Sequence, residues 1–67
     1  MEFKINDVWF GRIGTAYEGV TATIQAITER KIQVSFDRVV AVDGMMLGGC
    51  IFGKKQFQEL FEQVYWI

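Results

Sequence analysis

The chain has 67 residues, of which about half are hydrophobic and ten are aromatic, and it carries seven basic against eight acidic side chains. This length allows one domain, residues 1–67, and a domain so small needs a dense core or a partner for its stability. Cys50 is the only cysteine and there is no histidine, which excludes an internal disulfide and a tetrahedral Cys/His zinc site. The balanced charge argues against a general attraction to nucleic acid.

The expected compartment and assembly follow from the same composition. The N-terminal sequence lacks the apolar stretch of a signal peptide, and no run approaches the roughly 18 apolar residues that span a bilayer. A lone thiol without an export signal is typical of a reducing compartment, so we expect a cytoplasmic protein without a membrane partner. The excess of apolar residues predicts a partner-binding surface, with a homo-oligomer as the first expectation. A well-packed monomer with a few exposed aromatic rings is the alternative.

Alternation of apolar and polar residues predicts strands over about residues 7–52. Residues 7–13 favour a first strand that enters a glycine-bearing loop at 14–19. Segments 20–26 and 32–37 then alternate with period two and predict a hairpin across the polar turn between them. The residues expected on the core face of this hairpin are Val20, Ala22, Ile24, Ala26, Ile32, Val34 and Phe36.

A second hairpin is predicted after the first. Residues 38–42 form a β-branched run, and Asp43-Gly44 is a strong signal for a short hairpin turn. Residues 45–52 would be the return strand. The Gly48-Gly49 pair inside it predicts a bulge or a sharp bend.

The period changes near the end of the chain. Phe57, Leu60, Phe61 and Val64 lie at positions i, i+3, i+4 and i+7, which predicts a C-terminal helix over about residues 54–64. The predicted fold is therefore mainly β with one C-terminal helix. Short strands in one meander favour a small barrel or a strongly bent antiparallel sheet, with the helix at the open end or on one face.

Several segments resemble the opening of an SH3-like small barrel of the Tudor and KOW type, up to about residue 40. They are Asp7-Val8-Trp9-Phe10, where those domains have an Asp-x-Val opening, the Tyr17-Glu18-Gly19 loop, an Ala-x-Ile strand at 22–24 and a Val-x-Phe-Asp strand at 31–37. The resemblance implies a binding module for peptides, methylated side chains or nucleic acid. It also implies a cation-binding aromatic cage made by Trp9 or Phe10, Tyr17, Phe36 and Asp37. The alternation of Phe36 with its neighbours predicts instead that this ring is in the core.

The motifs that suggest catalysis are incomplete. Residues 48–55 have the Gly-x4-Gly-Lys spacing of a phosphate-binding loop, but Lys55 stands where that motif needs a hydroxyl for magnesium. Cys50 has no histidine to act as its base, and the carboxylates form no evident pair. We therefore expect a protein that is not an enzyme and that uses no cofactor and no metal.

Two groups of residues are candidate binding surfaces. The tail Tyr65, Trp66 and Ile67 does not fit the helical stripe and is typical of a protein-binding hot spot; Trp66 folding back over the barrel is the alternative. The second group is a possible ligand face that consists of Trp9, Tyr17, Arg30, Lys31, Lys54 and Lys55. Basic and aromatic side chains together would suit single-stranded nucleic acid.

The function we predict from the sequence is a non-catalytic binding module that acts by protein–protein contact. Its size suits an adaptor, a regulator or an inhibitor, including one carried by a phage or another mobile element. Nucleic-acid binding through the basic and aromatic face is the alternative.

Overall fold

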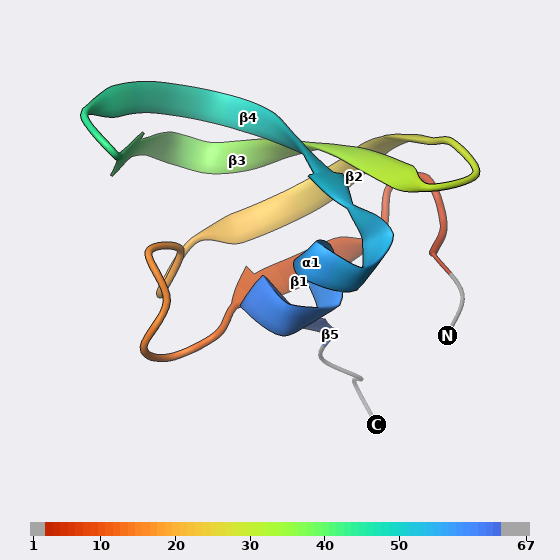
Figure 1. Cartoon of the computed structure of the whole chain (residues 1–67), viewed down its shortest axis with the longest axis horizontal. Helices are drawn as coiled ribbons and strands as arrows, with labels where there is room; N and C mark the ends of the chain where they lie inside the picture. The colour runs from red at the N-terminus through yellow and green to blue at the C-terminus, as the bar shows by residue number, and fades with distance from the viewer. Residues whose placement is uncertain (1–2, 64–67) are drawn as a thin grey trace.

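The computed structural model describes residues 3–63, and in this range the chain is mainly β with one short helix near its end. The elements are β1 (Val8–Gly11), β2 (Thr21–Ile27), β3 (Lys31–Val42), β4 (Met45–Gly53), α1 (Lys54–Leu60) and β5 (Phe61–Gln63). All five strands belong to one antiparallel sheet in the order β4-β3-β2-β1-β5 (Figure 1). Between residues 3 and 63 this sheet is not closed into a barrel. The predicted fold class is confirmed in its form of a strongly bent antiparallel sheet with a C-terminal helix.

The first predicted hairpin is formed by β2 and β3. Ile24 pairs with Val34, and the register shifts at the next residue of β2, so that Ile27 pairs with Ile32. This bulge reverses the alternation of β2, because one extra residue turns every later side chain to the other face. The expected place of Ala26 on the core face is therefore taken by Ile27, which packs against the core.

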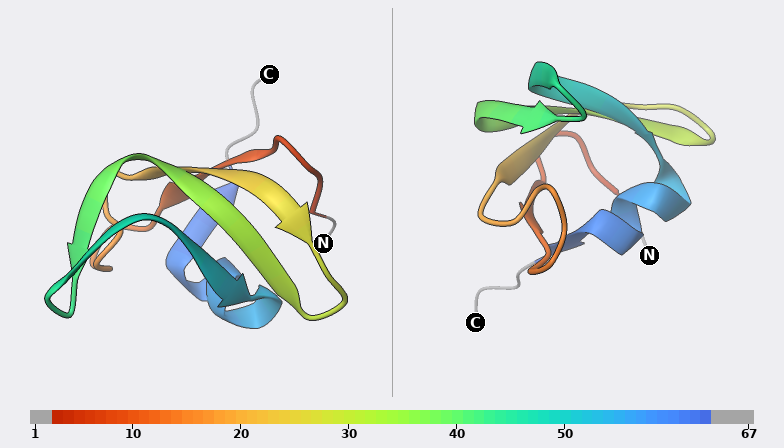
Figure 2. Two further views of the ribbon diagram at one scale, coloured as in Figure 1. Left: turned by 90° about the horizontal axis from the view of Figure 1, so that it is seen from above. Right: turned by 60° about the vertical axis from the view of Figure 1, so that its left-hand side comes forward.

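The second predicted hairpin is formed by β3 and β4, and its register shift is larger than that of the first hairpin. Ser35 pairs with Gly49, while Val40 pairs with Leu47, so residues 36–39 of β3 lie opposite Gly48 alone. The paired strands curve over the rest of the molecule at this point (Figure 2). The bend predicted from the glycine pair is confirmed, and residues 38–42 continue β3 through it instead of forming a separate strand.

The turn of this hairpin is the predicted Asp43-Gly44 pair. Both residues have positive φ angles, 50° and 78°, as the two central residues of a type I′ turn require. The turn leads directly into β4, which confirms the expected return strand.

The helix α1 begins at Lys54 as predicted but ends at Leu60, short of the expected boundary near residue 64. It ends there because the following residues pair with β1, with Phe61 opposite Gly11 and Gln63 opposite Trp9. The apolar stripe is confirmed as far as residue 61: Phe57 and Phe61 are buried, and Leu60 packs against the core. Val64, the last member of the predicted stripe, lies outside the described residues.

The core lies between the bent sheet and α1 (Figure 1). Phe61 is its centre. Its ring stacks on Phe57 with centroids 4.7 Å apart, and it contacts Tyr17 at 5.2 Å, Phe52 at 5.6 Å and Phe36 at 6.2 Å. This aromatic cluster joins residues from α1, β5, β3, β4 and the loop before β2. The buried apolar residues are Trp9, Tyr17, Val20, Ala22, Ile24, Ile32, Val34, Val40, Phe52, Phe57 and Phe61.

Candidate functional site

The two aromatic members of the predicted ligand face lie in the core. Trp9 is only 1% exposed and packs on Phe3 and Phe57, with ring centroids 5.3 Å and 5.1 Å away. Tyr17 is also buried, and this burial raises the pKa of its phenol, so the side chain stays neutral. The structure therefore does not place these rings beside the basic residues. The reason for Trp9 is its register: it pairs with Ala22, a buried residue small enough to leave room for the indole.

The residues to which the Tudor resemblance assigns a cage also have partners of their own. Phe36 is half-buried against Tyr17, with centroids 5.6 Å apart. Asp37 is on the surface, where its Oδ2 lies 3.0 Å from Nη2 of Arg38 and its Oδ1 accepts a hydrogen bond from the backbone N–H of Thr21. The hydrogen bond from Arg38 lowers the pKa of the Asp37 carboxyl, so this acid is ionised and paired at neutral pH.

The four basic members of the predicted face are brought together. Lys31 lies opposite Gly53 in the β3–β4 register, and the backbone N–H of Lys54 donates to the carbonyl of Arg30 at 3.0 Å. Arg30 and Lys31 therefore meet Lys54 and Lys55 where α1 begins. We call these four residues the basic corner. Lys54 is half-buried and the other three are exposed. A counter-charge, Glu29, belongs to the same turn.

The segment with phosphate-loop spacing does not form a loop. Residues 48–53 are part of β4 and pair with β3, and Lys54 begins the helix directly. Cys50 is half-buried opposite Val34. Among residues 3–63 no cluster of three or more acidic or cysteine side chains is suited to holding a metal ion, and no helix is long and apolar enough to cross a membrane.

An exposed apolar surface lies on the β3–β4 hairpin. Seven large apolar side chains are exposed in the described part of the chain. Four of them belong to this hairpin, and we call them the apolar hairpin: Val39, Met45, Met46 and Ile51. Met46 is 69% exposed and Ile51 is 60% exposed. The other three are dispersed over the N-terminal segment, β1 and the loop after it.

The strand β4 forms one edge of the sheet. It has β3 on one side, and within residues 3–63 no strand on the other. Its nine residues, Met-Met-Leu-Gly-Gly-Cys-Ile-Phe-Gly, include no charge and no proline. Sheet edges are usually protected by charged side chains, proline, short length or a bulge, because their free N–H and C=O groups pair with other strands. Of these protections, the β4 edge has only the irregularity at Gly48-Gly49.

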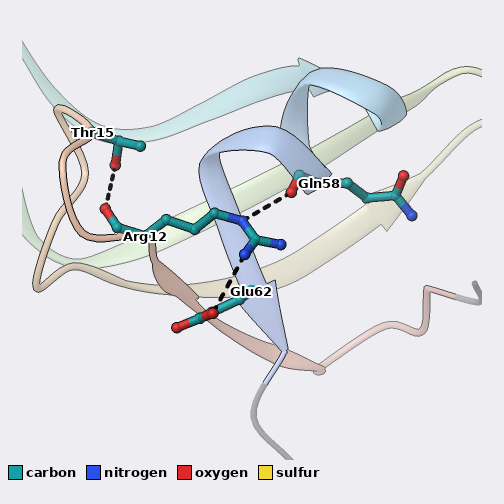
Figure 3. A network of polar contacts seen from close by, with 4 residues as sticks. All are labelled: Arg12, Thr15, Gln58 and Glu62. Atoms are coloured by element: carbon teal, nitrogen blue, oxygen red, sulfur yellow. Dashed lines mark hydrogen bonds and ion pairs between the residues drawn. The ribbon is translucent and has the colours of Figure 1, made fainter.

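The opposite edge of the sheet is short and is fastened within the chain (Figure 3). Nε of Arg12 donates to the carbonyl of Gln58 at 3.1 Å, its Nη1 lies 3.4 Å from Oε2 of Glu62, and its backbone N–H donates to the carbonyl of Leu60 at 2.8 Å. These contacts give partners to carbonyls at the end of α1, which a helix leaves unpaired. The Thr15 hydroxyl in turn donates to the Arg12 carbonyl at 2.8 Å. The three-residue β5 is thus a protected edge, unlike β4.

The β4 edge was not among the predicted sites, although its signal is present in the sequence. Residues 45–53 contain no charged side chain, but this matters only once the strand is known to lie at an edge. The tail Tyr65, Trp66 and Ile67 lies outside the described residues, and its role in binding stays a prediction.

Comparison with known proteins yields no match, since no family model, no curated protein and no solved structure is similar to this chain. The proposal of a function therefore rests on the surface of the molecule itself.

Proposed function

We propose that the protein is a non-catalytic binding module that acts through protein–protein contact, and that the apolar hairpin and the β4 edge make this contact. The observation that carries the proposal is the nine-residue edge strand without a charge, on which Met45, Met46 and Ile51 are exposed. Burial of each of these side chains against a partner would contribute roughly 1–2 kcal/mol. A strand added to β4 would also pair its outward backbone groups.

This proposal fits the class of adaptor, regulator or inhibitor, with the cytoplasm as its proposed compartment. A binding module is also what the resemblance to Tudor and KOW barrels implies. The basic corner supports nucleic acid as the second candidate, because backbone pairing brings four cationic residues close together there. It is the weaker candidate, since the aromatic rings expected beside it are buried and the net charge of the chain is −1.

The proposed function predicts the result of an affinity capture that uses the whole chain as bait, in a nuclease-treated lysate of the organism that makes it. We expect the wild type to retain one or more proteins in stoichiometric amount, an untagged copy of the chain included. Met46→Lys should reduce this retention at least tenfold, since it places a charge on the exposed face of β4.

The matched control is Ile13→Lys, which removes an equally apolar side chain that is 90% exposed in the loop after β1. This variant should retain the same proteins as the wild type. Proteins that are retained from an untreated lysate but not from the nuclease-treated one would contradict the proposal and favour nucleic acid at the basic corner. Equal retention by Met46→Lys and wild type would also contradict it.

A further inference from the structure

The strand that would occupy the β4 edge can be inferred from the pattern of β4 itself. We propose that it is the β4 strand of a second copy of this chain, added antiparallel about a two-fold axis, so that the two five-stranded sheets become one continuous sheet. This inference rests on the proposed function and names its partner.

The order of side chains along β4 favours this partner. Its core-side residues are those that pair with core-facing residues of β3, namely Met45, Leu47, Cys50 and Phe52. Met46 and Ile51 lie on the outer face, opposite Ala41 and Gln33. Leu47 and Cys50 are three residues apart yet share a face, whereas regular alternation requires an even step. Gly48 and Gly49 therefore occupy a single position of the alternation.

From the glycine pair outward, the order of core-side and outer residues along β4 is therefore the same in both directions. With a two-fold axis at this pair, Met46 lies opposite Ile51 of the second copy. By the same register Leu47 lies opposite Cys50, and Met45 lies opposite Phe52. Each pair joins residues of the same face, and the Met46–Ile51 pair occurs twice. The two most exposed side chains of β4 would thus cover each other, as a self-complementary two-fold contact requires.

The absence of charged side chains on β4 also favours a second copy as the partner. A two-fold contact between identical strands brings each charged residue near its own counterpart or near others of the same strand, and like charges oppose such pairing. Because β4 has no charge over residues 45–53, pairing with itself meets no repulsion. A foreign peptide would not require the strand to be uncharged or its pattern to be symmetric.

The lengths of the two sheet edges also favour a pair of chains that closes on itself. Of the two sheet edges in the described part of the chain, β5 has only three residues, and its Glu62 is paired with Arg12. Within residues 3–63 each chain therefore offers one long open edge, and a contact between two such edges leaves no long edge open. The assembly is a closed dimer, in contrast to an open fibre.

The test is the mass of the purified full-length chain in solution, measured by sedimentation equilibrium from micromolar to millimolar concentration. We expect the wild type to reach twice its chain mass of 7.7 kDa. Met46→Lys should weaken association at least 100-fold and sediment as a monomer, and its dispersed amide spectrum should show that it is folded. Ile13→Lys should remain a dimer.

The register has its own test. Met46→Lys and Ile51→Glu should each be monomeric alone but form a one-to-one heterodimer when mixed, since the new ammonium group then lies opposite the new carboxylate. A wild type that is monomeric throughout overturns the inference, as does a dimer that Met46→Lys leaves intact, and a mixture without heterodimer overturns the register. If the wild type is monomeric but Met46→Lys still abolishes protein capture, the proposed function stands and only the second copy is excluded.

Discussion

Replacement of Gly11 by alanine is expected to destabilise the fold severely. A Cβ atom at this position would lie 1.7 Å from the carbonyl oxygen of Tyr17 and 2.4 Å from its carbonyl carbon. Both are backbone atoms, and they are held by the hydrogen bond from Val20 N–H to the Tyr17 carbonyl. The clash therefore cannot be relieved by rotating a side chain. Relief would separate the loop before β2 from β1, against which Tyr17 is packed.

We expect a loss of at least 3 kcal/mol for Gly11→Ala, in the range of severe backbone and overpacking defects. This is a large part of the roughly 3–10 kcal/mol available to a domain of this size. The measurement is urea unfolding followed by circular dichroism, with each variant in the Met46→Lys background, because Gly48 lies at the proposed two-fold axis. The matched control is Gly48→Ala, where the new Cβ meets no heavy atom within 4 Å, and its stability should change by less than about 1 kcal/mol. Equal stability of both variants would refute the close approach of these two segments.

Phe61→Ala is expected to have the second-largest effect. The ring is fully buried and contacts four other rings, from α1, β3, β4 and the loop before β2. Truncation of a buried phenylalanine typically costs about 3–5 kcal/mol, because a cavity replaces its contacts. It should also free the chain after α1, since Phe61 is the first residue of β5 and fixes that strand against Gly11.

The unfolding of Phe61→Ala is best measured in the Met46→Lys background, so that dissociation of a dimer does not contribute to the transition. Phe61→Leu keeps most of the volume and should lose clearly less. Ile13→Ala, at an exposed position, should change stability by no more than about 0.5 kcal/mol. A Phe61→Ala variant that is as stable as Ile13→Ala would contradict the central place of this ring in the core.

The strands could be predicted from the sequence because their signals are local. The alternation of Ile32 and Val34 with polar residues needs no knowledge of the rest of the fold, and the Asp43-Gly44 turn has its own backbone preference. The end of the helix has no such signal. Phe61 fits a helical stripe, but it is also buried as the first residue of a strand. The choice is made by pairing with β1, about 50 residues earlier in the chain, and local periodicity does not contain that contact.

The candidate site, like the fold, could be predicted only where its signal is local in the sequence. The basic corner could be predicted in part, since Arg30-Lys31 and Lys54-Lys55 are visible as pairs, and the β3–β4 register brings them together. The buried position of Trp9 could not be predicted from the sequence. Trp9 was predicted to lie on the ligand face, yet its ring is in the core and its indole N–H has no hydrogen-bond partner within residues 3–63. Ring contacts with Phe3 and Phe57 offset the cost of burying this N–H without a hydrogen bond.

The central claim is that the outer edge of β4 is covered in solution, and hydrogen exchange tests it most directly. In a strand at an open edge, the amides that point away from the sheet exchange rapidly, whereas amides paired across a contact are protected. At millimolar concentration we predict protection at both inward and outward amides of residues 45–52, with the outward set losing protection on dilution and in Met46→Lys while β2 is unchanged. Rapid exchange of the outward amides in the concentrated wild type would contradict the account.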